Sequence, residues 1–287
     1  MFSLTLIRKK GTIKQARSFK MENTVEKLTK SVPEFARSQL HDFHMELKLC
    51  KKSANANAML RDMWRSLWTF CWTKYPAVLS VAADDLLKAG VDVRTPIKNG
   101  DEALARLPEM FERSGDSFKR IDRYFCRTLK RLYQAGADIN APINGKGNIL
   151  HRLGYTVIGE KCVELALALG ANPNARDATD KTPIFYMTGP QKVKLLYDAG
   201  ADVNAKDNAG VSVLAHHLRT SYIDKTESIK FLIEKGADLS ATDKSGKNIM
   251  WYAWEYCNPQ EIEMIEKAVK AKANQQKIMQ AKSDRTY

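Results

Sequence analysis

The stretch Ala199-Gly200-Ala201-Asp202-Val203-Asn204 decides the fold, because it recurs along the chain in phase with a second feature. Its glycine falls at five positions: Gly90, Gly136, Gly170, Gly200 and Gly236. An apolar residue stands fourteen positions after each glycine: Leu104, Leu150, Ile184, Leu214 and Met250. The intervals between the glycines are 46, 34, 30 and 36 residues, a period typical of repeat proteins. The chain is therefore expected to stack short helical pairs into one extended surface.

The segment that leads into Gly200 has the pattern of a helix. Val193, Leu195 and Leu196 are placed to form its buried face. Glycine directly after a helix is the usual left-handed cap, because it carries no side chain that would clash in that conformation. The sequence therefore predicts that a helix ends before each glycine of the repeat.

Beyond the glycine, the sequence predicts an extended segment, a turn and a new helix. Residues 201–204 begin the extended segment, and residues 207–210 form a polar turn that reverses the chain. In two copies the turn contains Asn-Gly, at residues 99–100 and 144–145, which is the strongest short hairpin signal. In the third copy the next helix is expected to open at Thr182-Pro183, since threonine caps helices and proline suits the first helical position.

With these features the chain resembles ankyrin-repeat proteins. Their Thr-Pro-Leu-His signature appears in pieces at four places: Asn148-Ile149-Leu150-His151, Thr182-Pro183-Ile184-Phe185, Ser212-Val213-Leu214-Ala215 and Asn248-Ile249-Met250-Trp251. The first copy, Glu102-Ala103-Leu104-Ala105, is the weakest. The resemblance covers residues 58–257. It implies an all-α solenoid of helix-turn-helix units with short β-hairpin-like turns and a helical cap at each end.

Four segments are predicted along the chain. Residues 1–22 form a basic, disordered tail, and residues 23–57 form an N-terminal helical cap. Residues 58–257 hold about five to six degenerate repeats, and residues 258–287 form a C-terminal helix with a loose tail. Apolar residues at helical spacing place helices at residues 24–50, 58–72, 78–88 and 260–281.

Three intervals depart from the common length. The interval of 46 predicts an insertion near residues 108–123, between the two helices of its unit. The interval of 30 is short, and Gly189-Pro190 is expected to force a tight link between its helices. The interval of 36 is slightly long, near residues 222–227. An insertion in a repeat protein is either a binding loop or a tolerated surface loop, and the sequence leaves both open.

The net charge of +13 is concentrated in the N-terminal third. Residues 1–83 hold fifteen Lys or Arg and six Asp or Glu, which gives +9 of the +13. A basic segment binds acidic proteins, nucleic acid or anionic lipid, and charge alone does not choose among them.

Cysteine usage and the N-terminus bear on location. The five cysteines are odd in number and widely spaced, so they are expected to be reduced thiols of an intracellular, cytoplasmic protein. No apolar run approaches the roughly 20 residues that span a bilayer. Residues 1–20 carry six basic residues and no acid, which also fits a mitochondrial transit peptide. A secreted bacterial or viral protein acting in a host cell is a further alternative.

Two clusters of side chains suggest binding. Three tryptophans four residues apart form one stripe on a helix, which either contacts a partner or a membrane or seals the first repeat: Trp64, Trp68 and Trp72. His41 and His44 share a helical face with Cys50 nearby, but zinc needs four ligands. We expect no metal there.

No catalytic constellation is expected. By the resemblance, His151 makes a structural hydrogen bond between adjacent hairpins, and no nucleophile is placed beside His216 or His217. Paired carboxylates are interpreted as helix-surface charges: Asp84, Asp85, Glu261 and Glu263. Gly154 and Gly159 have the spacing of a phosphate loop, but Glu160 stands where lysine is required. The sequence therefore predicts no enzyme and no cofactor.

The leading hypothesis is a protein-interaction scaffold or adaptor. The resemblance implies that a partner, possibly an acidic protein, binds to the hairpin tips and the concave helical face. The positions are Lys98, Asn99, Asp101, Asn144, Lys146, Tyr155, Thr179, Lys181, Asn208, Val211, Arg219, Lys244, Lys247 and Glu255. The alternative is binding of nucleic acid or an anionic surface by residues 1–83, with basic clusters at Arg8-Lys9-Lys10 and Lys51-Lys52.

Overall fold

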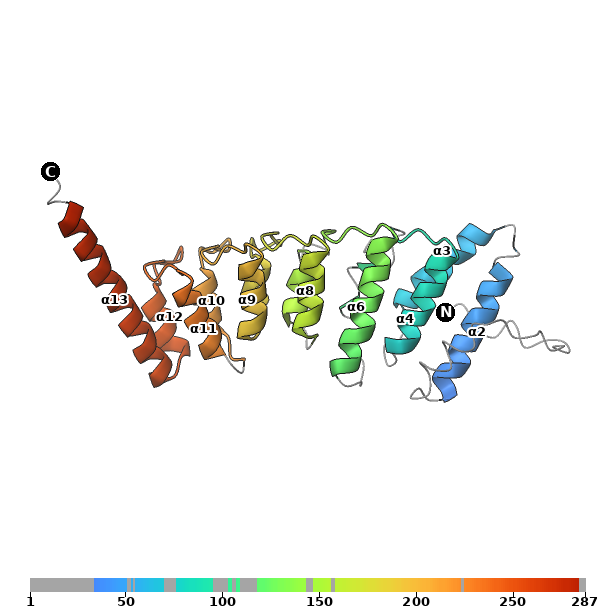
Figure 1. Cartoon of the computed structure of the whole chain (residues 1–287), viewed down its shortest axis with the longest axis horizontal. Coiled ribbons are helices and arrows are strands. Elements are labelled where there is room, and N and C mark those ends of the chain that lie inside the picture. Colours follow the sequence, from blue (N-terminus) through green and yellow to red (C-terminus); the bar gives the residue numbers. More distant parts are fainter. Residues whose placement is uncertain are drawn as a thin grey trace.

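The computed structural model describes residues 34–50, 53, 55–69, 76–94, 103–104, 107–108, 118–142, 147–155, 158–222 and 225–283. Over these ranges the chain is helical, and its helices stand side by side in one row (Figure 1). The described ranges hold no β-strand. Two isolated antiparallel bridges, Lys206 with Ser212 and Thr242 with Asn248, lie in the loops. At the level of fold class, the prediction of an all-helical chain is confirmed.

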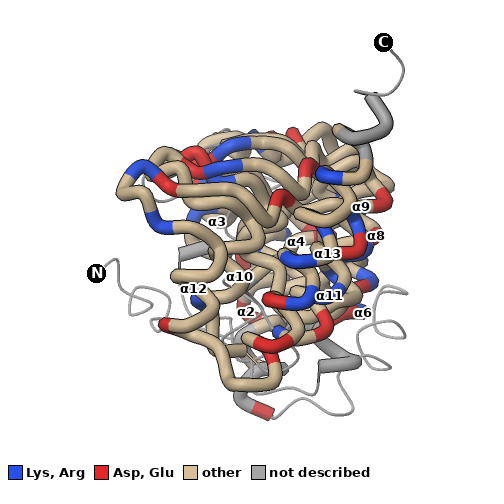
Figure 2. The backbone as a smooth tube through the Cα atoms, turned by 90° about the vertical axis from the view of Figure 1, so that its left-hand side faces the viewer, with Lys and Arg blue, Asp and Glu red and all other residues tan. Residues whose placement is uncertain are grey.

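From residue 118 onward the helices form two layers. One layer, here called the inner layer, consists of α7 (Ile149–Tyr155), the 3₁₀ turn η3 (Pro183–Tyr186), α10 (Val213–Arg219) and α12 (Ile249–Tyr256), which contact one another in succession. The outer layer consists of α6 (Phe118–Gln134), α8 (Glu160–Ala168), α9 (Pro190–Asp198) and α11 (Lys225–Glu234), again in succession. Seen along the row, α10 and α12 lie on one side and α6, α8 and α9 on the other (Figure 2).

The two ends of the row are closed by further helices. At the N-terminal end, α2 (Glu34–Cys50) and α3 (Ala56–Thr69) pack against α4 (Pro76–Lys88), which in turn packs against α6. At the other end, α13 (Pro259–Ser283) packs against α12. The predicted helix at 78–88 begins two residues earlier, because proline is well tolerated at the first position of a helix. The predicted tail at residues 1–22 lies outside the described residues.

Trp64 is fully buried on α3, at 0 % exposure, with Leu60 and Leu67 buried beside it. Trp64 is therefore a core residue and is not available to dock a partner. The side chains of Trp68 and Trp72 lie outside the described residues.

Each glycine of the repeat follows a helix end, as predicted. Gly200 has a φ of 88°, in the left-handed region that glycine adopts without steric cost. The N–H of Ala201 donates to the carbonyl of Leu196 at 2.9 Å, which satisfies a carbonyl at the helix end. The same bond recurs after the other four glycines, from Val91, Ala137, Ala171 and Ala237.

The aspartate of the phrase stabilises a turn directly after the glycine. Asp202 Oδ1 accepts the backbone N–H of Asn204 at 2.8 Å, the usual way in which aspartate stabilises a turn. Residues 203–204 therefore form a turn, where the sequence predicted the start of an extended segment.

In three of the five copies the phrase ends in asparagine, and this side chain joins its unit to the next. Asn204 Nδ2 donates to the carbonyl of Gly236 at 3.2 Å, and its Oδ1 accepts the N–H of Asp238 at 2.7 Å. Asn140 and Asn174 make the same two bonds to the units that follow them. The loops between the helices consequently form a hydrogen-bonded edge along the row, at the top of Figure 1.

The apolar anchors fill the core between the layers. Four are fully buried at 2 % exposure or less: Leu104, Leu150, Ile184 and Leu214. Met250, in the last copy, is only half-buried against the core. The constant offset from glycine to anchor thus reflects a constant length of chain between a helix end and the next buried anchor.

The third copy differs from the prediction. A helix was expected to open at Thr182-Pro183, but η3 is a single 3₁₀ turn of four residues, and Thr182 makes no side-chain cap hydrogen bond. The corresponding Ser212 and Asn248 do cap α10 and α12, accepting N–H groups at 3.2 and 2.8 Å. The short interval explains the difference, because α9 begins at Pro190 and leaves no room for a full helix.

The predicted insertion near residues 108–123 is partly helical. Residues 109–117 lie outside the described residues. Residues 118–123 form the first turns of α6, whose 17 residues exceed the 9 of α8 and of α9. The insertion therefore lengthens a helix as well as its loop.

Candidate interaction surface

Three hairpin loops of the edge share one geometry, set by an aspartate at the start of each. Asp207 Oδ1 accepts the N–H groups of Ala209 and Val211 at 2.9 and 3.0 Å, and its own N–H donates to the carbonyl of Val211. Asp177 and Asp243 make the corresponding bonds within their loops. Together the segments 177–181, 207–211 and 243–247 are called the loop edge below.

Tyrosines of the inner layer support two of these loops from within. Tyr252 Oη donates to Asp243 Oδ2 at 2.7 Å, and Tyr186 donates to Asp177 in the same way. Although burial opposes ionisation of these carboxylates, the hydrogen bonds from the tyrosines and the loop N–H groups hold the pKa of both below its usual value. The loops are thus held in a fixed shape by inner-layer side chains.

Three of the predicted binding residues come together on the loop edge. The N–H of Asn208 donates to the carbonyl of Thr179 at 3.0 Å, and Lys244 Nζ donates to the carbonyl of Asn208 at 2.7 Å. All three side chains are exposed. They form a continuous polar line from one loop to the next.

Two predicted residues are engaged within the protein. The side chain of Val211 is 5 % exposed, so the prediction that it contacts a partner was wrong. The turn around Asp207 points it into the core. Lys181 Nζ lies 3.9 Å from the buried carboxylate of Asp207 and 5.8 Å from the centroid of the Tyr186 ring. With a side chain only 16 % exposed, Lys181 holds neighbouring units together and offers little charge to a partner.

Other predicted residues fall at the C-terminal end of the inner layer or outside the described residues. Arg219 and Glu255 are exposed at the ends of α10 and α12. Tyr155 is the last residue of α7, and only its backbone is described. Five positions lie outside the described residues: Lys98, Asn99, Asp101, Asn144 and Lys146.

An aromatic cluster on α12 was missed by the sequence interpretation. The ring of Trp251 packs edge-on against Tyr252 and Tyr256, at centroid distances of 5.1 and 6.1 Å. Trp254 is 64 % exposed and Tyr256 is 41 % exposed. The signal was present in the sequence, since four aromatic residues fall within residues 251–256. Large aromatic groups left exposed on a helix mark contact surfaces more often than isolated apolar residues do.

One cation lies against these rings, and a second stands on the neighbouring helix. Lys247 Nζ lies 3.7 Å from the centroid of the Trp251 ring, a cation–π contact. Arg219 is exposed at the end of α10, which packs against α12, and its charge opposes the rise in the pKa of Tyr252, which burial and Asp243 raise to about 12. Three rings of α12 and these two cations are together called the α12 patch below: Arg219, Lys247, Trp251, Trp254 and Tyr256.

Three of the four carboxylates interpreted as surface charges are in fact buried. Asp84, at 3 % exposure, pairs with Arg127 at 2.6 Å and with Arg131 at 3.7 Å. Asp85 pairs with His44 at 2.8 Å. Glu261 is 2 % exposed and accepts the hydroxyl of Thr226 at 2.6 Å. These acids join neighbouring helices, because a buried carboxylate must be paired. Of the four, Glu263 is the one exposed at the surface.

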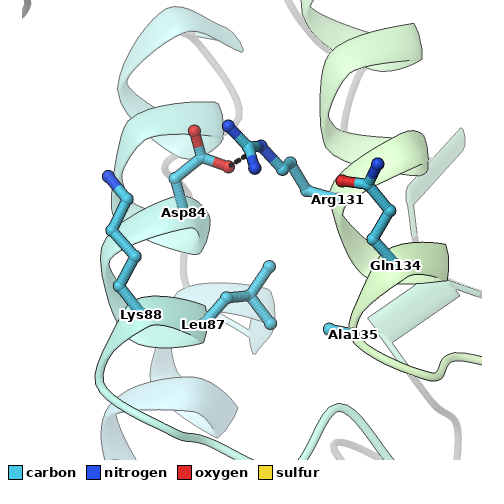
Figure 3. Close-up of a pocket in the computed structure, with 6 residues that line it drawn as sticks. All are labelled: Asp84, Leu87, Lys88, Arg131, Gln134 and Ala135. Carbon is cyan, nitrogen blue, oxygen red and sulfur yellow. Dashed lines mark ion pairs between the residues drawn. The ribbon is translucent and has the colours of Figure 1, made fainter.

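A shallow pocket lies between α4 and α6, beside the Asp84 ion pairs (Figure 3). It is lined by Asp84, Leu87, Lys88, Arg131, Gln134 and Ala135. Its volume of about 220 Å³ is below the range of typical small-molecule sites. The buried carboxylate of this pocket, Asp84, is already paired with Arg127 and Arg131, so it offers no free charge to a ligand.

The histidines make structural hydrogen bonds. His151 Nε2 lies 3.1 Å from the carbonyl of Lys181 in the next unit, as the resemblance implied, and burial lowers its pKa. His217 bonds the carbonyl of Ile184 at 3.0 Å. Burial lowers the pKa of His217 to about 4 and that of His216 to about 3. All three are therefore uncharged at neutral pH.

Gly159, one of the two glycines with phosphate-loop spacing, also makes a hydrogen bond within the protein. The N–H of Gly159 donates to a carboxylate oxygen of Asp122 at 2.8 Å. Within the described ranges, no group of three or more His, Cys, Asp or Glu side chains is placed to hold a metal ion. None of the described helices is long and apolar enough to cross a membrane.

Comparison with models of known protein families finds no match for this chain, and a search of curated proteins finds none either.

Proposed function

We propose that this chain is a non-catalytic scaffold of the ankyrin-repeat type that binds another protein through its loop edge and inner layer. Support for the repeat type comes from the recurring phrase, its constant offset to the buried anchors, and the asparagine bonds between successive units. A row of units held in this way presents a surface that is already formed before a partner arrives, so binding costs little conformational entropy.

The observation that carries the proposal is the exposure of Trp254, at 64 %, on the helix that also carries the other rings of the α12 patch. Burying such a side chain removes a large apolar area from water, and tryptophan, tyrosine and arginine are the residues most often found to dominate binding energy. The α12 patch combines all three types on adjoining helices of the inner layer.

The partner is an acidic protein with an apolar side chain in its contacting segment. Lys247 lies against the ring of Trp251, and Arg219 is exposed at the end of the neighbouring helix α10. Lys244 adds positive charge on the loop edge. Glu255 is the one predicted binding residue on α12 that carries a negative charge, and we assign it to the polar rim of the interface. An acidic segment would gain ion pairs from the cations while its apolar group covers Trp254.

The test is quantitative affinity purification with the full chain as bait. The double variant Trp254→Ser/Tyr256→Ser is compared with the wild type and with Ile278→Ser, a control that removes an exposed apolar residue, at 56 % exposure, from the distal part of α13. Wild type and control should retain the same partners, and the double variant should lose them at least tenfold. Retention of every partner by the double variant, with unchanged circular dichroism, would exclude the α12 patch.

A further inference from the structure

Two thiols from neighbouring helices of the outer layer meet at the boundary between units. Cys126 Sγ on α6 lies 3.0 Å from Cys162 Sγ on α8, although 36 positions separate them in the sequence. The sequence interpretation saw only widely spaced cysteines. Cys50 and Cys257 have different neighbours, the backbone carbonyls of Ala56 and Leu218.

The geometry of the pair is close to that of a disulfide. A disulfide bond is about 2.05 Å long and requires side chains that face each other across a short backbone distance. The two sulfur atoms are already within about 1 Å of that length, and α6 and α8 are packed against each other. Forming the bond therefore needs a small side-chain adjustment and no rearrangement of the helices.

The two thiols differ in their surroundings. Cys162 is fully buried, whereas Cys126 is half-buried and open to a small reagent. The hydrogen bond with Cys162 lowers the pKa of Cys126, aided by Lys161 and opposed by burial and Asp122, while the pKa of Cys162 is raised. The more accessible sulfur thus carries more thiolate character, and thiolate character with access determines which cysteine is oxidised first.

We propose that Cys126 and Cys162 are a modification site at which a hydroperoxide produces an intramolecular disulfide between α6 and α8. The Cys126 thiolate attacks the peroxide, the O–O bond breaks, and Cys126 becomes a sulfenic acid while an alcohol, or water from hydrogen peroxide, departs. Cys162 then attacks the sulfenic sulfur, the S–S bond forms, and the hydroxyl leaves as water with the proton of Cys162. Two sulfurs are oxidised by two electrons in total, and the peroxide is reduced.

The bond would tie two successive units together. Because the residues are 36 positions apart, the closed loop restricts the unfolded chain and stabilises this part of the row. Thiol–disulfide exchange with a small dithiol reverses it. The modification is independent of the α12 patch and of the proposed partner.

The test uses the reduced full chain, treated with hydrogen peroxide, blocked with N-ethylmaleimide and digested with trypsin. We expect one dominant cross-linked species, in which the peptide of residues 124–127 is joined to that of residues 162–176. The same treatment in concentrated urea is the control. There, pairing should spread over the five cysteines. Native cross-linking at this pair no greater than in urea would overturn the proposal.

Two variants separate the roles of the cysteines. Cys162→Ser should leave Cys126 as a sulfenic acid that dimedone labels, and Cys126→Ser should abolish the cross-link without dimedone labelling of Cys162. In the wild type, oxidation should raise the melting temperature and a dithiol should restore it, whereas neither variant should respond. Cross-links between molecules, or oxidation of Cys126 to sulfinic acid with Cys162 free, would contradict the proposed pairing.

Discussion

Asn204 Oδ1 accepts the backbone N–H of Asp238 at 2.7 Å, although the two residues are 34 positions apart in the chain. The same side chain donates to the carbonyl of Gly236. A single amide thus satisfies one donor and one acceptor of the following unit. This bond explains why asparagine recurs at the sixth position of the phrase.

The first prediction concerns this asparagine. Asn204→Ala removes both bonds and should lower the free energy of unfolding by about 1–2 kcal/mol, as measured by urea denaturation. Asn208→Ala is the matched control, because Asn208 contributes backbone groups to the loop edge and its change should be within about 0.5 kcal/mol. Equal effects of the two substitutions would mean that the asparagine bonds do not couple the units.

The second prediction compares two anchors. Leu214→Ala removes a side chain that is 1 % exposed, and it should lower the free energy of unfolding by about 2–5 kcal/mol. Met250→Ala, at the corresponding position of the last copy, should cost clearly less, because Met250 is only half-buried. Thermal denaturation of both variants measures the difference. A larger loss for Met250→Ala would contradict the assigned core.

The third prediction concerns stability at mildly acidic pH. Burial lowers the pKa of His217 to about 4, below the value of about 6.5 in an unfolded chain. The unfolded state therefore binds the proton first, and stability should fall as the pH drops from about 6.5 towards 4, by up to about 1.4 kcal/mol per pH unit for each such histidine. Above this window the contribution is constant.

Urea denaturation at several pH values measures this slope. His217→Gln should reduce it, and His41→Gln, which removes an exposed histidine from α2, should leave it unchanged. Because His216 titrates in the same direction, part of the slope should remain in His217→Gln. An unchanged slope in that variant would show that His217 is not held uncharged by burial.

The parts of the fold that depend on local chemistry could be predicted from the sequence. The position directly after a helix often adopts a left-handed conformation that favours glycine. The recurring phrase therefore predicted the helix ends near Gly90 and Gly200. The anchors followed from their constant offset. The collapse of the third copy to η3 could not be predicted, because a short interval does not reveal which helix loses the residues.

The candidate site was harder to predict, since exposure depends on distant parts of the chain. Asp84 is buried because Arg127, 43 positions away, packs over it. Val211 is buried because the turn at Asp207 fixes its direction. On α12, aromatic residues fall on several faces. The sequence does not reveal that α10 and α13 pack against other faces of this helix and leave Trp254 exposed.

The most direct test of the central claim is hydrogen–deuterium exchange of the full chain with and without the partner recovered by affinity purification. The account predicts slower amide exchange on binding in residues 243–256, which hold the last hairpin loop and α12, with exchange in the outer-layer helices α8 and α9 unchanged. Protection confined to the outer layer or to α13, with none in residues 243–256, would contradict it.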